Sequence, residues 1–382
     1  MILNDYPMLR VRTSLRAGDK PGTADLLAAA SDSRYIAGGI SYDDFGSSSI
    51  SKHRTSLWFD MGGLVADGDL LMLRGSTGLD RIDLNKLSYG RAEYLIPVDH
   101  NGTKLGLYGA NSLYKVGETL APLQIEGTAT IMGFYLTHPL IKKRDQTLSV
   151  RAGFDYKNVT DYMLDTLNSK DNIRALSLGV SYDFYDGLEG RNVIGLTYHQ
   201  GLSGFLGGAA RNEVGTSRAD ADGGFNKYTM DYVRLQGITE FTHILLKAAG
   251  QVSGTTLFSA EQFSIGGMGT VRGFKSSAHS GDSGYIFSAE LHTWPIFPEA
   301  KIFGQRLGDT IKFVPFADCG RVYKDNVQPG ENKNNYIQSV GAGLRLYAGR
   351  KFSMRLDYAV PKVNGIFHKR NSMTYAQASM AF

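Results

Sequence analysis

The sequence of 382 residues contains a single cysteine, ten prolines and no long apolar run. One cysteine, Cys319, excludes an internal disulfide framework and a cysteine-rich metal site. The longest stretch without a charged residue, Asn192 to Ala210, contains five glycines as well as His199 and Gln200. A transmembrane helix needs ~20 mostly apolar residues, so this stretch cannot form one. A helical membrane protein is therefore excluded.

Charge of one sign is also scarce, because 41 basic residues stand against 37 acidic ones and leave a net charge of +4. So small an excess does not predict nucleic-acid binding, which normally needs a concentrated basic patch. The N-terminus, Met1 to Pro7, lacks the basic, apolar and cleavage regions of a signal peptide. This leaves either a cytosolic protein or a mature or truncated form.

Glycine and aromatic residues are abundant instead. The chain has 46 glycines, with 19 Phe, 21 Tyr and 2 Trp. Glycine is thus about 12% of the sequence, against ~7% in average proteins. So much glycine and so little proline argue against a mostly helical protein, and the length suits one large all-β unit.

Apolar residues alternate with small or polar ones wherever the chain does not read as loop. Three segments show the pattern most clearly, at 147–156, 176–184 and 352–360. This period of two is typical of β-strands with one apolar face. A soluble sandwich also alternates, but here the second face mixes charges with Gly and Ser, as a water-filled lumen requires.

Division of the chain at turn signals predicts sixteen strands. Long connections at 203–223, 254–283, 324–335 and 362–372 each follow an odd-numbered strand, whereas the connection 297–310 breaks this alternation. The fold class is therefore predicted to be all-β, a sixteen-stranded antiparallel transmembrane β-barrel. The predicted strands lie near residues 34–44, 49–63, 68–79, 85–97, 103–115, 124–139, 144–160, 170–186, 190–202, 224–236, 239–253, 284–296, 311–323, 336–347, 351–361 and 373–382.

The most informative motif lies inside the long connection 254–283, where four glycines accompany Arg272 between Ser264 and Phe274. A guanidinium carried into a confined space needs a carboxylate partner. Asp318 offers one, on a predicted strand where Phe316 and Gly320 share its face, and Glu290 is a possible brace. From the residues alone, an ordinary loop and an ordinary polar lumen residue explain the same pattern.

Two motifs in this order, Val271-Arg272-Gly273-Phe274 and then Phe316-x-Asp318-x-Gly320, followed by a terminal Phe382, resemble the transporter (TpsB) component of two-partner secretion, a relative of BamA. The resemblance implies that the connection folds from outside into the lumen and that Arg272 binds Asp318 on the inner wall. Gly273 and Phe274 would shape the loop tip, Phe316 would pack beside it, and Phe382 would be the C-terminal assembly signal.

The same resemblance covers the N-terminus, where Leu3-Asn-x-x-Pro7 and Pro21-Gly-Thr23 are similar to the end of the family's second POTRA domain. It implies that residues 1–30 are a remnant of that domain with its linker and that residues 31–382 form the barrel. By this resemblance, we expect the chain to lack the family's signal peptide, its plug helix and nearly all of both POTRA domains. An open, conducting barrel with weakened or absent secretion activity is therefore expected.

The function implied by the resemblance is a passive outer-membrane pore, with the N-terminus on the periplasmic side. It would export a TpsA-type exoprotein of the adhesin, haemolysin or contact-dependent toxin type, in extended form. Its other partners would be outer-membrane lipid and the barrel assembly machinery. The prediction includes no enzymatic activity, no cofactor, no metal and no nucleic acid.

Other functions stay open at this point. The barrel of a patatin-like autotransporter and a BamA-like insertase share the architecture, and a diffusion porin gives no reason for the arginine motif. A lipase is disfavoured, because Gly201-Leu-Ser203-Gly204 near His199 is not the nucleophile elbow Gly-x-Ser-x-Gly. Cys319 follows Asp318 and is expected to face lipid as an inert small residue.

Overall fold

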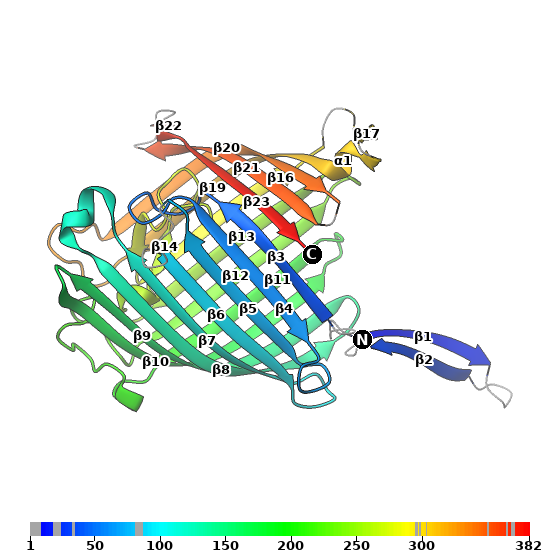
Figure 1. Ribbon diagram of the computed structural model, residues 1–382, viewed down its shortest axis with the longest axis horizontal. Coiled ribbons are helices and arrows are strands. Elements are labelled where there is room, and N and C mark those ends of the chain that lie inside the picture. Colours follow the sequence, from blue (N-terminus) through cyan, green and yellow to red (C-terminus); the bar gives the residue numbers. More distant parts are fainter. Residues whose placement is uncertain are drawn as a thin grey trace.

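The computed structural model describes residues 9–17, 24–32, 35–80, 87–294, 297, 299–302, 304–349, 351–363, 366–367 and 371–382. Within these residues, sixteen antiparallel strands close into one barrel (Figure 1). The predicted fold class is confirmed, and each predicted strand has a counterpart in the barrel.

The barrel strands follow one another round the wall in chain order, and β23 closes the ring against β3. Their bounds are β3 (Tyr35–Asp43), β4 (Arg54–Gly62), β5 (Leu70–Gly78), β6 (Leu87–Pro97), β7 (Lys104–Lys115), β8 (Glu126–Lys142), β9 (Gln146–Met163), β10 (Thr166–Tyr185), β11 (Arg191–Gly201), β12 (Asn226–Gly237), β13 (His243–Ser253), β16 (Ser283–His292), β19 (Ile311–Tyr323), β20 (Asn334–Ala348), β21 (Phe352–Val363) and β23 (Met373–Ala381).

Short elements occupy the connections. The 3-10 helices are η2 (Glu118–Leu123), η3 (Phe205–Gly207) and η4 (Ser259–Glu261), and the short strands are β14 (Phe263–Ile265), β15 (His279–Gly281) and β22 (Ile366–Phe367). The irregular connection at 297–310 contains β17 (Lys301–Ile302), β18 (Gln305–Arg306) and the single-turn helix α1 (Leu307–Thr310). Figure 1 shows β17 and α1 at the end of the barrel toward which β1 and β2 also lie. In the described part of the chain, no helix is long and apolar enough to span a membrane.

The alternation in sequence becomes two surfaces in the structure. On β10, Leu176, Leu178 and Val180 are 48%, 60% and 43% exposed. Large apolar side chains are exposed in the same way on most of the remaining barrel strands, where they alternate with small or polar residues. Successive side chains of a strand point to opposite faces, so the apolar set forms the outer face of the barrel. The intervening small and polar residues face inward.

The ring is least extensively paired at its seam. β23 and β3 pair over five residues, from Gln377 opposite Asp43 to Ala381 opposite Gly39, whereas β9 and β10 pair along most of their length. Phe382 extends the seam, because its amide donates to the Gly38 carbonyl at 2.9 Å. The first and last barrel strands are therefore joined by a short antiparallel contact.

The N-terminal segment forms a separate hairpin. β1 (Leu9–Ala17) pairs with β2 (Ala24–Asp32) and with no barrel strand among the described residues. The predicted boundary at residue 31 falls inside β2, and the barrel begins at Tyr35. The Leu3–Pro7 and Pro21–Thr23 motifs lie outside the described residues.

Candidate functional site

The connection between β13 and β16, residues 254–282, is largely packed against other parts of the chain. Two buried apolar clusters contain its residues: Leu257 and Phe258 in one, Ile265 and Val271 in another. A third, around Phe316, packs against its Met268. Burial of apolar side chains stabilises a protein core, and these three contacts stabilise the position of the connection in the same way.

Arg272 is the largest of the fully buried side chains in this connection. It is only 2% exposed, and the next residue, Gly273, has φ +86°, a conformation that favours glycine. A Cβ built on Gly273 would also lie 3.3 Å from the backbone nitrogen of Pro361 on β21. The glycine therefore lets the backbone turn close to the barrel wall while the guanidinium points into it.

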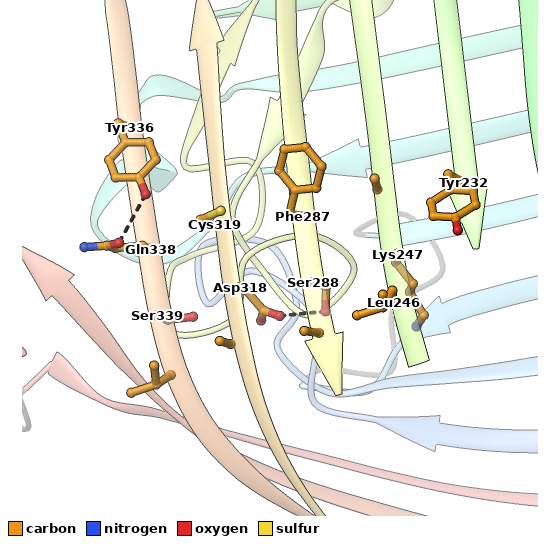
Figure 2. Close-up of a pocket in the computed structure, with 14 residues that line it drawn as sticks. Tyr232, Leu246, Lys247, Phe287, Ser288, Asp318, Cys319, Tyr336, Gln338 and Ser339 are labelled. Atoms are coloured by element: carbon orange, nitrogen blue, oxygen red, sulfur yellow. Dashed lines mark hydrogen bonds between the residues drawn. The ribbon is translucent and has the colours of Figure 1, made fainter. Parts of the chain in front are cut away.

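Asp318 on β19 binds the guanidinium with both carboxylate oxygens. Arg272 Nε lies 2.7 Å from Asp318 Oδ2, and Arg272 Nη2 lies 2.8 Å from Oδ1. The Arg272 backbone amide donates to Oδ2 at 3.2 Å as well. Such a fork is the strong form of an arginine–carboxylate pair. Ser288 on β16 donates to Asp318 Oδ1 at 2.7 Å and orients the carboxylate (Figure 2).

Two further carboxylates complete the site. Arg272 Nη1 lies 2.8 Å from Glu290 Oε1 on β16 and 3.4 Å from Asp357 Oδ2 on β21. Arg345 and Arg355 also bind Asp357. Three arginines thus meet three carboxylates in a cluster that is buried except for the partly exposed Arg355. We call it the arginine site: Arg272, Arg345, Arg355, Glu290, Asp318 and Asp357. Equal numbers of the two charges allow the cluster to be buried.

Aromatic residues hold the loop tip against the wall. The Arg272 guanidinium carbon lies 3.4 Å from the centre of the Phe316 ring. The Tyr375 hydroxyl on β23 accepts from the Gly273 amide at 2.9 Å and donates to the Phe274 carbonyl at 3.1 Å. A cation over a ring face and a bonded hydroxyl both favour one geometry, so the tip is fixed to four strands: β16, β19, β21 and β23.

The electrostatics of the site favour a permanently charged arginine. Burial lowers the pKa of the Arg272 guanidinium, but Asp318, Glu290 and Asp357 raise it above its usual value. Arg272 therefore acts as a fixed cation and not as a proton donor. Among the described residues, no group of three or more His, Cys, Asp or Glu side chains is arranged to hold a metal ion.

The structure brings together most of the residues singled out from the sequence. Val271 packs on Val322 and Ile337, and a Cβ on Gly320 would lie 3.2 Å from it. Phe382 lies apart, at the seam. His199 Nε2 lies 3.4 Å from Thr229 Oγ1, and among the described residues no hydrogen bond joins His199 to Ser203.

Sequence reasoning did not connect Asp357 and Arg355 with Arg272, and it missed Tyr375 and Ser288 altogether. Ser288 was detectable, because it shares the face of Glu290 at a spacing of two. Tyr375 carries no such signal, since it lies 102 residues from Gly273.

Cys319 lies on the other side of the wall from the arginine site. It lines a hollow of about 480 Å³ together with Phe287, Leu246, Val340 and small residues of neighbouring strands. Figure 2 shows this hollow, with Cys319 next to Asp318 on β19. Phe287 and Val340 are exposed outer-face residues, so Cys319 belongs to the apolar outer surface.

A closed sixteen-stranded barrel with an apolar outer face defines an outer-membrane β-barrel protein. The family model of the haemolysin secretion/activation proteins ShlB/FhaC/HecB matches residues 22–346, and the chain belongs to this family. The chain is 27% identical over 378 residues to the heme/hemopexin transporter protein HuxB of Haemophilus influenzae (strain 86-028NP), covering 96% of this chain and 63% of HuxB. It is 22% identical over 264 residues to the outer membrane transporter CdiB of Escherichia coli, covering 69% of this chain and 40% of CdiB.

Solved structures show the same fold. CdiB from Escherichia coli matches with a TM-score of 0.79 at 18% identity, covering 100% of this chain and 69% of that one. BamA from Haemophilus ducreyi lacking POTRA domains 1–3 is more distant, with a TM-score of 0.66 at 13% identity, covering 100% and 77%. The predicted resemblance is thus confirmed, and the family is one of transporters and not of enzymes. The chain spans less than two thirds of the length of the HuxB relatives.

Proposed function

We propose that this chain forms the pore through which a large partner exoprotein crosses the outer membrane to the cell surface. The observation that carries the proposal is the arginine site, because a simple diffusion pore has no need of a loop held by three buried carboxylates. Membership of the haemolysin secretion/activation family supports the same function. The relatives HuxB and CdiB are named as transporters.

We infer that the connection 254–282 lies inside the lumen. Glu290, Asp318 and Asp357 are buried, at positions that alternate with exposed apolar residues such as Phe287 and Tyr358. A loop that reaches all three must approach the wall from within the barrel. There the connection narrows the opening and exposes backbone polar groups to the passing chain. Arg272 acts as a latch, because it fixes the connection to the wall and so sets the shape of the path.

We propose the orientation of the barrel in the membrane from the parity of its strands. If β3 runs from the periplasm outward, β13, the eleventh barrel strand, ends outside and the connection 254–282 enters from the cell surface. The N-terminus then lies in the periplasm, where the hairpin of β1 and β2 would belong to the end of a POTRA domain. In this orientation, Phe382 lies at the periplasmic end of β23, where the barrel assembly machinery would meet it.

The partner we propose is a secreted exoprotein of the adhesin, haemolysin or toxin type, passed in extended form. An inner wall that carries both charge signs can contact such a chain without binding any segment strongly. Outer-membrane lipid would cover the apolar face. We propose no catalytic step, and the folding of the exoprotein outside the cell would give the transport its direction.

Deletion of the gene in its native bacterium tests this function. Mass spectrometry of the culture medium and of peptides shaved from intact cells should show the loss of one large protein. The unaltered gene should restore it, and an Arg272→Ala gene should restore much less at an equal amount of folded barrel. An unchanged set of exported proteins after deletion would contradict the transport function, and full restoration by Arg272→Ala would contradict the latch.

A further inference from the structure

A second charged site holds the connection 254–282, eight residues after β13 ends at Ser253. Glu261, in η4, is only 7% exposed and lies between two lysines of the barrel wall. Lys227 Nζ on β12 lies 2.8 Å from Glu261 Oε2, and Lys157 on β9 binds the other carboxylate oxygen. No other acidic side chain of this connection is buried between two cations.

The backbone of Glu261 is held as firmly as its carboxylate. Its carbonyl accepts from Lys227 Nζ at 2.9 Å and from Gln251 Nε2 on β13 at 3.0 Å. Gln251 also donates to the carbonyl of Asp282, at the far end of the connection, at 3.0 Å. The Asp282 carboxylate in turn accepts from the Leu257 amide at 2.8 Å. Both ends of the connection are therefore tied to one another and to the wall.

The charge of this lysine site is fixed. Burial raises the pKa of the Glu261 carboxyl, but Lys157 and Lys227 lower it to about 2. The carboxylate is therefore ionised at neutral pH, and removal of its charge leaves the two lysines without their bonded anion, with Asp155 of β9 as a remaining carboxyl group nearby. Loss of one charge from a buried ion pair is strongly destabilising, because the other charge is left without its partner.

The two sites have opposite polarity. At the arginine site the loop supplies the cation, Arg272, and the wall supplies an excess of carboxylates. At the lysine site the loop supplies the anion, Glu261, and the wall supplies the cations. A loop seated in the reverse direction would place Arg272 against two lysines and Glu261 against acidic side chains. Like charges at close range disfavour a wrong arrangement as strongly as unlike charges favour the right one.

We propose that Glu261, with Lys157 and Lys227, is a second positioning site, and that its polarity makes the connection 254–282 seat in one direction across the pore. This inference rests on the proposed placement of the connection in the lumen. The lysine site fixes the base of the loop on β9 and β12, and the arginine site fixes its tip on β16, β19 and β21. Each site restrains its own part of the path for the exoprotein.

Single-channel recording of the 382-residue barrel in planar bilayers, with potassium chloride as the probe, tests the second site. We expect the parent barrel to show one steady conductance level. Glu261→Gln should replace it by several fluctuating levels, and Glu261→Lys should do so more severely. The triple variant Glu261→Lys, Lys157→Glu and Lys227→Glu exchanges the charges and should restore one level. If Glu261→Lys acted only through the size of the new side chain, the exchange would not restore it. Glu213→Gln, at an exposed glutamate of the connection after β11, is the matched control.

The outcomes separate this inference from the proposed function. Heat-modifiable migration of the folded barrel in gels first shows that each variant folds, and a Glu261→Lys barrel that does not fold leaves Glu261→Gln and the exchange variant as the test. A parent-like conductance for Glu261→Gln, or no rescue by the exchange, overturns the second site. If Arg272→Ala also leaves the conductance unchanged, the placement of the loop in the pore is wrong as well. If Arg272→Ala alters it, only the lysine site is refuted.

Discussion

Two walls of the barrel carry charged residues at inward positions, and the charges are neutralised differently on the two walls. On β16, β19 and β21, the side chains of Glu290, Asp318 and Asp357 are at most 5% exposed and converge on Arg272. Arg345 and Arg355 alone would leave one of these three carboxylates without a cation. This wall is therefore complete only when the connection 254–282 is seated on it.

On the opposite stretch of wall, β6 to β9, the charged residues satisfy one another. Arg91 lies 2.7 Å from Glu93, two residues along the same strand, and its side chain is 30% exposed. Tyr135 donates to the same glutamate, and Arg151 lies 3.6 Å above the Tyr135 ring. No residue of the connection 254–282 is required there, apart from Glu261 at Lys157 on β9.

The comparison shows that the same alternation of apolar and polar residues has a different role on each wall. Both walls place polar residues at every second position, but one wall uses them to hold a loop, and on our proposal the other leaves them facing the open part of the barrel. The self-sufficient wall is the one that an extended exoprotein would contact on our proposal. Chemically similar substitutions should therefore have different effects on the stability and loop docking of the barrel, depending on which wall carries them.

The largest effect is expected for Asp318→Ala. Arg272 would lose both bonds of its fork in a buried site, and breaking such a pair costs roughly 3–5 kcal/mol. Hydrogen exchange of residues 254–282 in the detergent-solubilised barrel should become much faster. Glu93→Ala on the other wall is the control and should leave this exchange unchanged. Equal protection in Asp318→Ala and the parent barrel would mean that the arginine site does not hold the loop.

A pair of glycine substitutions compares the two walls directly. A Cβ on Gly341 of β20 would lie 2.3 Å from the Phe316 ring and 2.2 Å from the Tyr358 carbonyl oxygen, whereas a Cβ on Gly109 of β7 would meet nothing within 4 Å. Overpacking costs roughly 1–3 kcal/mol. Gly341→Ala should lower the temperature at which the barrel loses its folded gel mobility, and Gly109→Ala should change it little. Equal shifts in both variants would contradict the packing of Phe316 described above.

Tyr375→Phe removes one hydroxyl that serves two groups of the loop tip. The expected loss is about 1–3 kcal/mol of loop docking, because the Gly273 amide is left without its partner. Faster exchange should be confined to Gly273 and its neighbours, with the Arg272 amide still protected by Asp318. Tyr336→Phe, at an exposed tyrosine on β20, is the control. Deprotection of the whole connection would show that Tyr375, and not Arg272, is the main restraint.

The smallest effect is expected for Arg151→Gln. This arginine is exposed, and a cation over a ring at an exposed site contributes about 0.5–1 kcal/mol. The stability of the barrel should change by no more than this amount, and the exchange of residues 254–282 should stay as in the parent. Loop deprotection by Arg151→Gln would remove the distinction between the two walls.

Much of the fold was predictable because its signals are local. Turn signals and alternation with a period of two depend only on neighbouring residues, and together they placed all sixteen strands to within a few residues at most ends. β4 is shorter than predicted, since residues 49–53 belong to the turn before Arg54. β10 begins at Thr166, earlier than predicted, because β9 and β10 continue as one tight hairpin through Leu164 and Asp165.

The candidate site was predictable only in part. Arg272, Asp318 and Phe316 stand in motifs with recognisable spacing, and Glu290 lies on a strand next to β19. Glu261 and Lys157 are 104 residues apart, and the contact depends on how the closed ring brings β9 and the connection together. No spacing rule encodes such a contact, since ring closure and loop docking are properties of the whole chain.

The central claim is that Val271 and Arg272 lie against β19 inside the folded barrel. A disulfide between Val271→Cys and Gly320→Cys, in a Cys319→Ser background, tests it most directly, because a Cβ on Gly320 would lie 3.2 Å from the Val271 side chain. We predict that mild oxidation of the folded barrel forms this disulfide in high yield, and that adding Arg272→Ala lowers the yield sharply. Folded barrels in which both cysteines stay reduced would contradict the account.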